Sequence, residues 1–146
     1  MMNNLSAFMK GNAAEFGTVK IAISERFKDE NGKAAEWEIK AINPEEDSRL
    51  RKEYTKEVPL PGKSGKMGAT QPRLDYNSYM CALAAKCVVF PNLNNASLQD
   101  SYGVKGAEKL LRVMLLPGEY YDLIAEVQKA NGFDIGLGDM VEEAKN

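Results

Sequence analysis

Apolar residues alternate with polar residues over positions 18–42 and then recur with helical spacing from residue 75 onward. Alternation is typical of a strand with one buried face, whereas recurrence every three to four residues indicates an amphipathic helix. The alternating residues are Val19, Ile21, Ile23, Phe27, Ala35, Trp37, Ile39 and Ala41. This change of period predicts an α+β fold in a single domain over 1–146. An N-terminal β-hairpin over about 18–42 precedes a mainly α-helical part, 75–146, and the chain has four to five helices in all.

The turn of this hairpin determines its register. A two-residue turn at Asn31 and Gly32 would put the apolar faces on opposite sides, because a shift of one residue inverts every side chain. A three-residue loop over 30–32 aligns the faces and places Gly32 in the left-handed position of such loops. It gives three facing pairs: Ile23 with Ile39, Ile21 with Ala41, and Phe27 with Ala35. A lone hairpin is only marginally stable, so its apolar face needs cover from helices or another chain.

Capping residues predict where the helices begin and end. Asn43 and Pro44 are typical of a helix start, and this helix carries acid-to-base pairs four residues apart at 45–49 and 47–51. Asp75 is expected to cap a helix that buries Tyr76, Tyr79, Met80, Leu83, Ala84, Cys87 and Val88. Pro91 is expected to stop it. Shorter helices follow, one over 96–102, one burying Leu110 and Leu111, and one from Pro117 to Gly132, and a weak helix is expected over 4–16.

Two segments are candidates for binding a partner. Residues 56–73 contain three Pro and three Gly without any period, and therefore predict a long, flexible basic loop. Structureless loops of that length are usually functional or disordered. Later in the chain, several apolar residues lie close to glycines in the sequence. They either cover the core or form a docking surface. The candidate binding residues are Lys63, Lys66, Arg73, Leu116, Tyr120, Tyr121, Phe133, Ile135 and Leu137.

The composition argues against an enzyme. The sequence contains no histidine, which removes the commonest general base and the histidine metal sites. Its two cysteines, Cys81 and Cys87, lie six apart in a predicted helix, so they are expected to be buried apolar residues. No phosphate-binding loop is present among the glycines at 62, 65 and 68. We therefore expect no catalytic residues, no cofactor and no metal. The sequence shows neither a signal peptide nor a membrane-spanning run, so a cytosolic location without membrane binding is expected.

The distribution of charge leaves nucleic-acid binding open as an alternative function. Residues 49–73 carry a net charge of +5 and residues 117–146 a net charge of −5, so the two segments could attract each other or oppositely charged partners. Residues 96–116 could form a helix-turn-helix with Lys105, Lys109 and Arg112 on its outer face. The acidic balance of the chain, with a pI near 5.3, argues against DNA binding. A small helix-turn-helix regulator remains the alternative, and no nucleic-acid partner is expected.

Seven strings recur in order in one known family. They are ERF at 25–27, EWEI at 36–39, VPLPGK at 58–63, FPNLN at 90–94, LQDSYGV at 98–104, LPGEY at 116–120 and EEAKN at 142–146. Over almost its whole length the chain resembles the XkdN-like tail assembly chaperones of tailed phages and PBSX-type phage-like elements. The block over 90–104 is the most specific part of this resemblance.

The resemblance implies a non-enzymatic chaperone in the cytoplasm of the bacterial host. Such chaperones bind the tape measure protein while tail tube subunits polymerise around it, and they are absent from the mature virion. The tail tube protein and further copies of the chain are additional expected partners. Many members also have a longer form made by a −1 frameshift, and codons for residues 144–146 can contain a slippery heptamer. A structural tail component retained in the particle is the remaining alternative.

Overall fold

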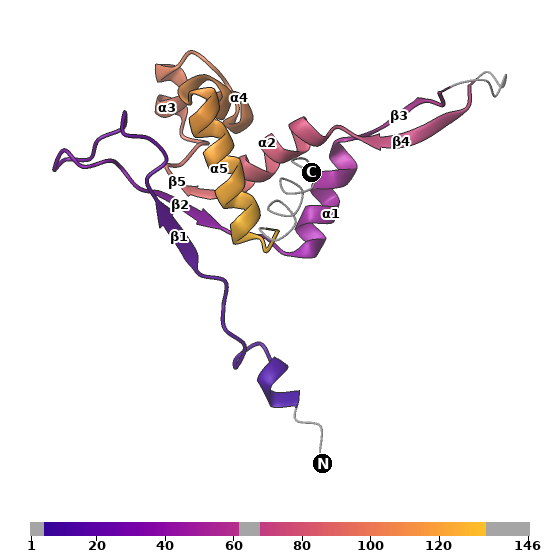
Figure 1. Ribbon diagram of the computed structural model, residues 1–146, viewed down its shortest axis with the longest axis horizontal. Helices are drawn as coiled ribbons and strands as arrows, with labels where there is room; N and C mark the ends of the chain where they lie inside the picture. Colours follow the sequence, from indigo (N-terminus) through magenta and orange to yellow (C-terminus); the bar gives the residue numbers. More distant parts are fainter. Residues whose placement is uncertain (1–4, 62–67, 134–146) are drawn as a thin grey trace, which may run out of the picture.

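Short antiparallel strands with helices packed on one another form the centre of the fold. The computed structural model describes residues 5–61 and 68–133. Its three-stranded sheet has the order β1-β2-β5, with β1 at Thr18–Ile21, β2 at Trp37–Lys40 and β5 at Val88–Phe90 (Figure 1). The strands β3 (Thr55–Pro59) and β4 (Thr70–Leu74) form a separate antiparallel ribbon.

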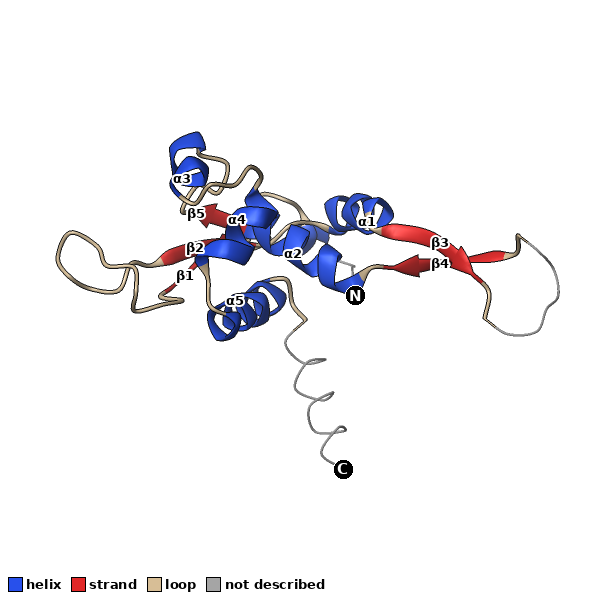
Figure 2. Cartoon of the chain, turned by 90° about the horizontal axis from the view of Figure 1, so that it is seen from above, coloured by secondary structure: helices blue, strands red, loops and turns tan. Residues whose placement is uncertain are grey.

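Five α-helices lie within the described residues, and together with the strands they confirm the predicted α+β class. They are α1 (Pro44–Glu53), α2 (Tyr76–Cys87), α3 (Ala96–Ser101), α4 (Ala107–Met114) and α5 (Pro117–Ala130). Figure 2 shows α2 running through the middle of the molecule, with the β3–β4 ribbon extending to one side and the β1–β2 connection to the other. In line with that position, α2 contacts α1, α4, α5 and β5.

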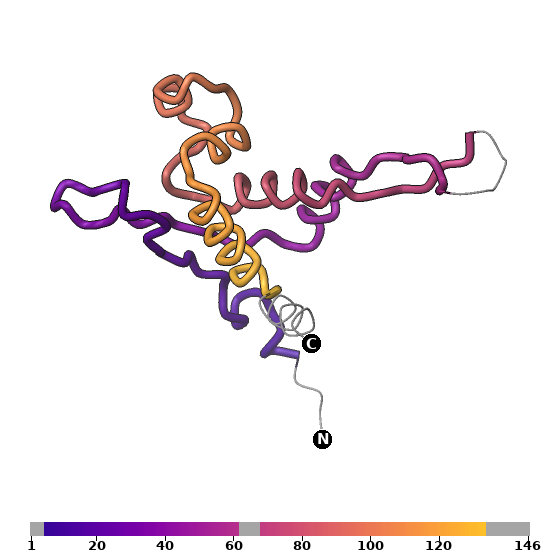
Figure 3. The backbone as a smooth tube through the Cα atoms, turned by 45° about the horizontal axis from the view of Figure 1, so that its top comes forward, coloured from indigo at the N-terminus to yellow at the C-terminus, as the bar shows by residue number. Residues whose placement is uncertain are grey.

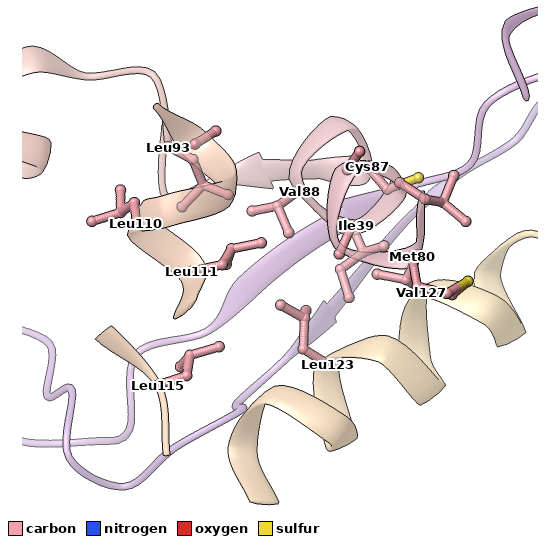
Figure 4. Packing of buried hydrophobic residues seen from close by; sticks show 14 of the residues in the cluster. Ile39, Met80, Cys87, Val88, Leu93, Leu110, Leu111, Leu115, Leu123 and Val127 are labelled. Carbon is pink, nitrogen blue, oxygen red and sulfur yellow. The ribbon is translucent and has the colours of Figure 1, made fainter. Parts of the chain in front are cut away.

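The core lies where the sheet, α2, α4 and α5 meet (Figure 4). Ile39 of β2 is fully buried, and so are Leu110 and Leu111 of α4 and Leu123 and Val127 of α5. The two cysteines are buried and free, as expected for small apolar residues inside a helix. Burial of this kind removes apolar surface from water and is the main stabilising term for so small a domain.

The predicted hairpin register is correct at the turn and wrong further out. The Asp29 N–H donates to the Lys33 carbonyl at 2.7 Å, which encloses a three-residue loop, and Gly32 has φ +78°. Along β1 and β2, however, Ile21 faces Trp37 and Val19 faces Ile39. Residues 22–26 leave the ladder because Ile23 is buried and Ser24 and Arg26 bind α5. The strand pairing therefore shifts while the buried face stays the same.

In the segment predicted to be a flexible loop over 56–73, most of the residues that the structure describes belong instead to the β3–β4 ribbon. Thr55 pairs with Leu74, and the ladder continues to Pro59 opposite Thr70. Both strands are mostly exposed, so their sequence has no apolar alternation that would reveal them. Proline lacks an N–H, so it is tolerated in edge strands at positions where the N–H of another residue would face solvent. Lys63 and Lys66 lie outside the described residues.

Helix starts were predicted well, and the end of α2 was not. The Asn43 side chain accepts a hydrogen bond from Glu46 N at 2.9 Å, and Asp75 caps α2 by accepting from Ser78 N. The helix stops at Cys87, before Pro91, because Val88–Phe90 pairs with β2 as a strand. Tyr76, expected to be buried, is 54% exposed at the start of α2.

The N-terminal segment lies apart from the core. A 3-10 helix over Leu5–Phe8 replaces the α-helix expected over 4–16, and the segment extends away from the sheet (Figure 3). Leu5, Phe8 and Met9 are exposed there. A helix this short is marginal in water when no packed surface supports it.

Candidate functional site

A groove of about 680 Å³ lies between α2 and α5. Tyr76, Asn77 and Met80 of α2 form one wall. Residues of α5 and the segment just before it form the facing wall and floor: Leu115, Pro117, Tyr120, Tyr121, Ile124, Ala125 and Gln128. The groove is thus an apolar concavity with polar groups at its margin, the general form of a binding site.

Tyrosines dominate the margin of the groove. Tyr121 is 68% exposed, and its ring meets the ring of Tyr120 edge-on, with centroids 5.7 Å apart and planes inclined at 68°. Across the groove, Gln128 Nε2 donates to the Tyr76 hydroxyl at 3.2 Å. Tyrosine combines a large apolar surface with a polar tip, so such a margin can contact apolar and polar groups of a ligand.

Arg112 of α4 brings a positive charge to the same groove. Its contact with the Cys81 thiol raises the Arg112 pKa, which keeps the guanidinium charged. Burial, followed by the contact with Cys81, raises the pKa of the Tyr120 hydroxyl, so that tyrosine stays neutral. The groove therefore presents apolar surface with a cation beside it.

A second groove of about 380 Å³ adjoins the first at the base of the β3–β4 ribbon. The two share Tyr76 and Asn77, and Lys56 and Arg73 line the second. Hydrogen bonds from Ser78 lower the Asp75 pKa, and the charges of Lys56 and Arg112 lower it further. The composite surface, here defined as both grooves together, is apolar at α5 and basic toward the ribbon.

Residues 5–145 match the sequence profile of the family described as phage XkdN-like tail assembly chaperone protein, TAC. The chain belongs to this family. The expected family resemblance is thereby confirmed over nearly the whole length.

Two curated relatives of this XkdN-like chaperone come from Bacillus subtilis strain 168. The phage-like element PBSX protein XkdN is 31% identical over 144 residues, which cover 98% of this chain and 94% of that protein. The uncharacterized protein YqbN is 33% identical over 144 residues, covering 98% and 93%. A crystal structure of the protein YqbN superposes with a TM-score of 0.74 at 25% identity and covers 92% of this chain and 100% of that one.

A partly buried group of hydrogen bonds positions α5 of the XkdN-like chaperone beside the groove. Glu119 accepts from the Arg26 guanidinium and from the Ser24 hydroxyl, and Leu116 N donates to it at 2.7 Å. These hydrogen bonds, Arg26 first, lower the Glu119 pKa to about 2. Arg26 also donates to the Met114 carbonyl at 2.8 Å. The hairpin thus holds the start of α5 in place.

A second contact fixes α2 against α1. The Tyr79 hydroxyl donates to Asp47, and Asp47 also accepts from Arg51 Nε at 2.9 Å. The Arg51 guanidinium carbon lies 4.6 Å from the centre of the Tyr79 ring. Because α2 carries one wall of the groove, this contact helps to maintain the shape of the groove.

The structure brings together three of the residues predicted to bind a partner. Tyr120 and Tyr121 line the α2–α5 groove, and Arg73 lines the adjoining one. Leu116 is 56% exposed just before α5, and Phe133 is 45% exposed just after it. Ile135 and Leu137, like the two loop lysines, lie outside the described residues.

Other groove residues were missed at the sequence level. Tyr76, Met80 and Ile124 belong to apolar stripes that also fill the core, so their spacing does not separate the groove from the interior. Arg112 entered the sequence analysis only through the helix-turn-helix alternative, whereas it lines the groove beside α5. Its place depends on how α4 packs on α2, which the local sequence does not specify.

Neither a membrane-spanning helix nor a metal-binding cluster is found in the part of the chain that the structure describes. None of its helices is both long enough and apolar enough to cross a membrane. Within the same residues, no three acidic or cysteine side chains gather in a way that could hold a metal ion.

Proposed function

We propose that this XkdN-like chaperone binds the tape measure protein and keeps it from aggregating while tail tube subunits polymerise around it. The observation that carries the proposal is the apolar, tyrosine-lined groove between α2 and α5, in a chain of the tail assembly chaperone family. Membership in a chaperone family also favours a non-enzymatic role.

The shape of the groove favours a helical client. Amphipathic helices commonly dock by placing residues at i, i+3 or i+4, and i+7 into an apolar groove. Met80, Leu115 and Ile124 offer the apolar contact, and Tyr121 offers an exposed aromatic ring of the kind enriched in binding hot spots. A tape measure protein is a long helix with exposed apolar stripes, so it supplies such anchors repeatedly.

The basic side of the composite surface favours acidic residues beside the apolar stripe of the client. Lys56 and Arg73 lie next to Tyr76, where the two grooves join. Exposed charges of this kind contribute more to orientation and association rate than to affinity. Modest affinity suits a chaperone that the tail tube protein must displace. We therefore propose that the chaperone acts in the host cytoplasm and is absent from the mature virion.

Co-expression with the tape measure protein of the same phage element tests this proposal. Tyr121→Glu places a charge at the groove margin and is expected to lower the soluble fraction of the tape measure protein at least threefold. Val113→Glu is the matched control, since Val113 is also half-exposed but does not line the groove. Circular dichroism establishes that both variants fold.

Equal solubility of the tape measure protein with Tyr121→Glu and with the unsubstituted chain would contradict the groove as its binding site. Mass spectrometry of purified tails tests the other part of the proposal. A chaperone is lost from the particle, whereas a stoichiometric amount of the chain in finished tails would identify it as a structural tail component.

A further inference from the structure

The stretch of this chain that follows α5 in the sequence has a composition that matches the α2–α5 groove. Helix α5 ends with the Gly132 N–H donating to the Lys129 carbonyl and the Phe133 N–H donating to the Gln128 carbonyl at 2.8 Å. Gly132 has φ +86°, and this pair of bonds is a Schellman motif, which ends the helix. Gln128 itself lines the groove. Residues 134–146 therefore begin six positions after a residue that lines the groove.

The composition of residues 134–146 complements the composite surface. Their apolar residues are Ile135, Leu137, Met140 and Val141. The segment has a net charge of −3, which results from four acidic residues, Asp134, Asp139, Glu142 and Glu143, and one basic residue, Lys145. The composite surface offers apolar contact around Met80 and Ile124. Its charged lining residues are the cations Lys56, Arg73 and Arg112 and one carboxylate, Asp75, so positive charge is in excess. The apolar and acidic residues of the segment thus match the apolar and basic residues of the composite surface in kind.

The lengths agree as well. From Pro117 to Gln128, α5 follows the groove for about 16 Å at 1.5 Å per residue. The thirteen residues of 134–146 span about 20 Å as a helix and up to about 43 Å when extended. Either conformation is long enough to run back along the groove toward Tyr121 and the base of the ribbon.

From these observations we infer that residues 134–146 occupy the α2–α5 groove of their own chain when no client is bound. The segment is an internal competitor for the groove. The docking of the segment involves this chain alone. The competition of the segment with the tape measure protein rests on the proposed function. If the segment leaves the groove free in one molecule in ten, client binding is weakened about tenfold.

Methyl NMR of the full-length chain without client tests the docking. The double substitution Ile135→Asp and Leu137→Asp removes apolar anchors and is expected to shift the Met80 and Ile124 methyl signals. The matched control, Gly136→Asp with Gly138→Asp, adds the same two charges but keeps both anchors, so it is expected to leave those signals near their original positions. Unchanged signals in the first variant would overturn the inference.

A spin label locates the segment directly. Met140→Cys can be labelled selectively, since Cys81 and Cys87 are both buried. The label is expected to broaden the Met80 and Ile124 methyl signals, and to lose this effect when Ile135→Asp and Leu137→Asp are also present. Labelled and isotope-enriched chains are then mixed as separate molecules. Broadening in that mixture would show docking between copies, and would overturn docking within one chain.

The competition is tested separately. The Ile135→Asp, Leu137→Asp chain is expected to bind the tape measure protein about tenfold more tightly than the unsubstituted chain. Spin-label broadening without tighter client binding would reject the competition and leave the docking in place. Failure of the chaperone to bind the client at all would contradict the proposed function while leaving the NMR result intact.

Discussion

Glu119 in the first turn of α5 forms an ion pair with Arg26, which lies 93 residues earlier, in the loop that leaves β1. The carboxylate Oε1 lies 2.6 Å from Arg26 Nη2, and Oε2 accepts from Arg26 Nε at 3.1 Å. Two parallel hydrogen bonds of this kind fix the orientation of both side chains, and a negative charge is favourable at a helix N-terminus. This contact joins the hairpin to the helix that carries the tyrosine margin of the groove.

Acid is expected to weaken the protein through Glu119. Its pKa falls from an ordinary 4.5 to about 2 in the folded state, so the contact stabilises the fold above pH 4.5. That stabilisation is lost as the pH falls from about 4.5 toward 2. Urea unfolding at pH 7 and pH 3 is expected to show a smaller drop in unfolding free energy for Glu119→Gln than for the unsubstituted chain. Glu45→Gln is the control, because Glu45 is exposed and paired at 3.5 Å. An identical drop in all three proteins would contradict the prediction.

Alkaline conditions are expected to act through Tyr79. Burial and the hydrogen bond to Asp47 raise its pKa to about 12, above the ordinary value of 10. The folded state therefore favours the protonated hydroxyl, and this stabilisation, complete below pH 10, is lost between pH 10 and 12. Tyr79→Phe removes the hydroxyl and is expected to lower the unfolding free energy by about 1–2 kcal/mol at pH 7. Tyr76→Phe is the comparison, since Tyr76 is 54% exposed and its hydroxyl does not contact Asp47. An equal loss in both variants would refute the special role of Asp47.

Leu123 lies fully buried where α5 packs against the core. Leu123→Ala removes apolar contact and leaves a cavity, so a loss of about 2–5 kcal/mol is expected in chemical denaturation. Leu116→Ala makes the same chemical change at a residue that is 56% exposed, and should cost less than about 1 kcal/mol. Similar losses at the two positions would mean that α5 does not pack as described.

The cap of α1 offers a local test. Asn43→Ala leaves Glu46 N without its side-chain acceptor and is expected to cost about 1 kcal/mol. Asn43→Ser keeps an acceptor oxygen and should retain most of the stability. Thermal unfolding of the two variants measures the difference, and equal melting temperatures would exclude a role for the cap.

Local signals in the sequence were enough to place several features. Asn43 and Asp75 start their helices, Gly132 ends α5, and the three-residue loop before Lys33 closes the first turn. Each of these depends on residues within five positions of one another. Short-range hydrogen bonds and backbone preferences act in the same way wherever such a string occurs, so they can be inferred without the rest of the fold.

Contacts between distant segments account for the features that were missed. Residues 22–26 leave the β1–β2 ladder because Ser24 and Arg26 reach Glu119, and Val88–Phe90 is a strand because β2 lies beside it. The ribbon over 55–74 has no buried face to impose a period on its sequence. The groove likewise exists because α2, α4 and α5 meet, and residues on the same apolar stripe divide between core and groove according to the angle of that packing. Packing of this kind joins residues far apart in the chain, so a local pattern does not contain it.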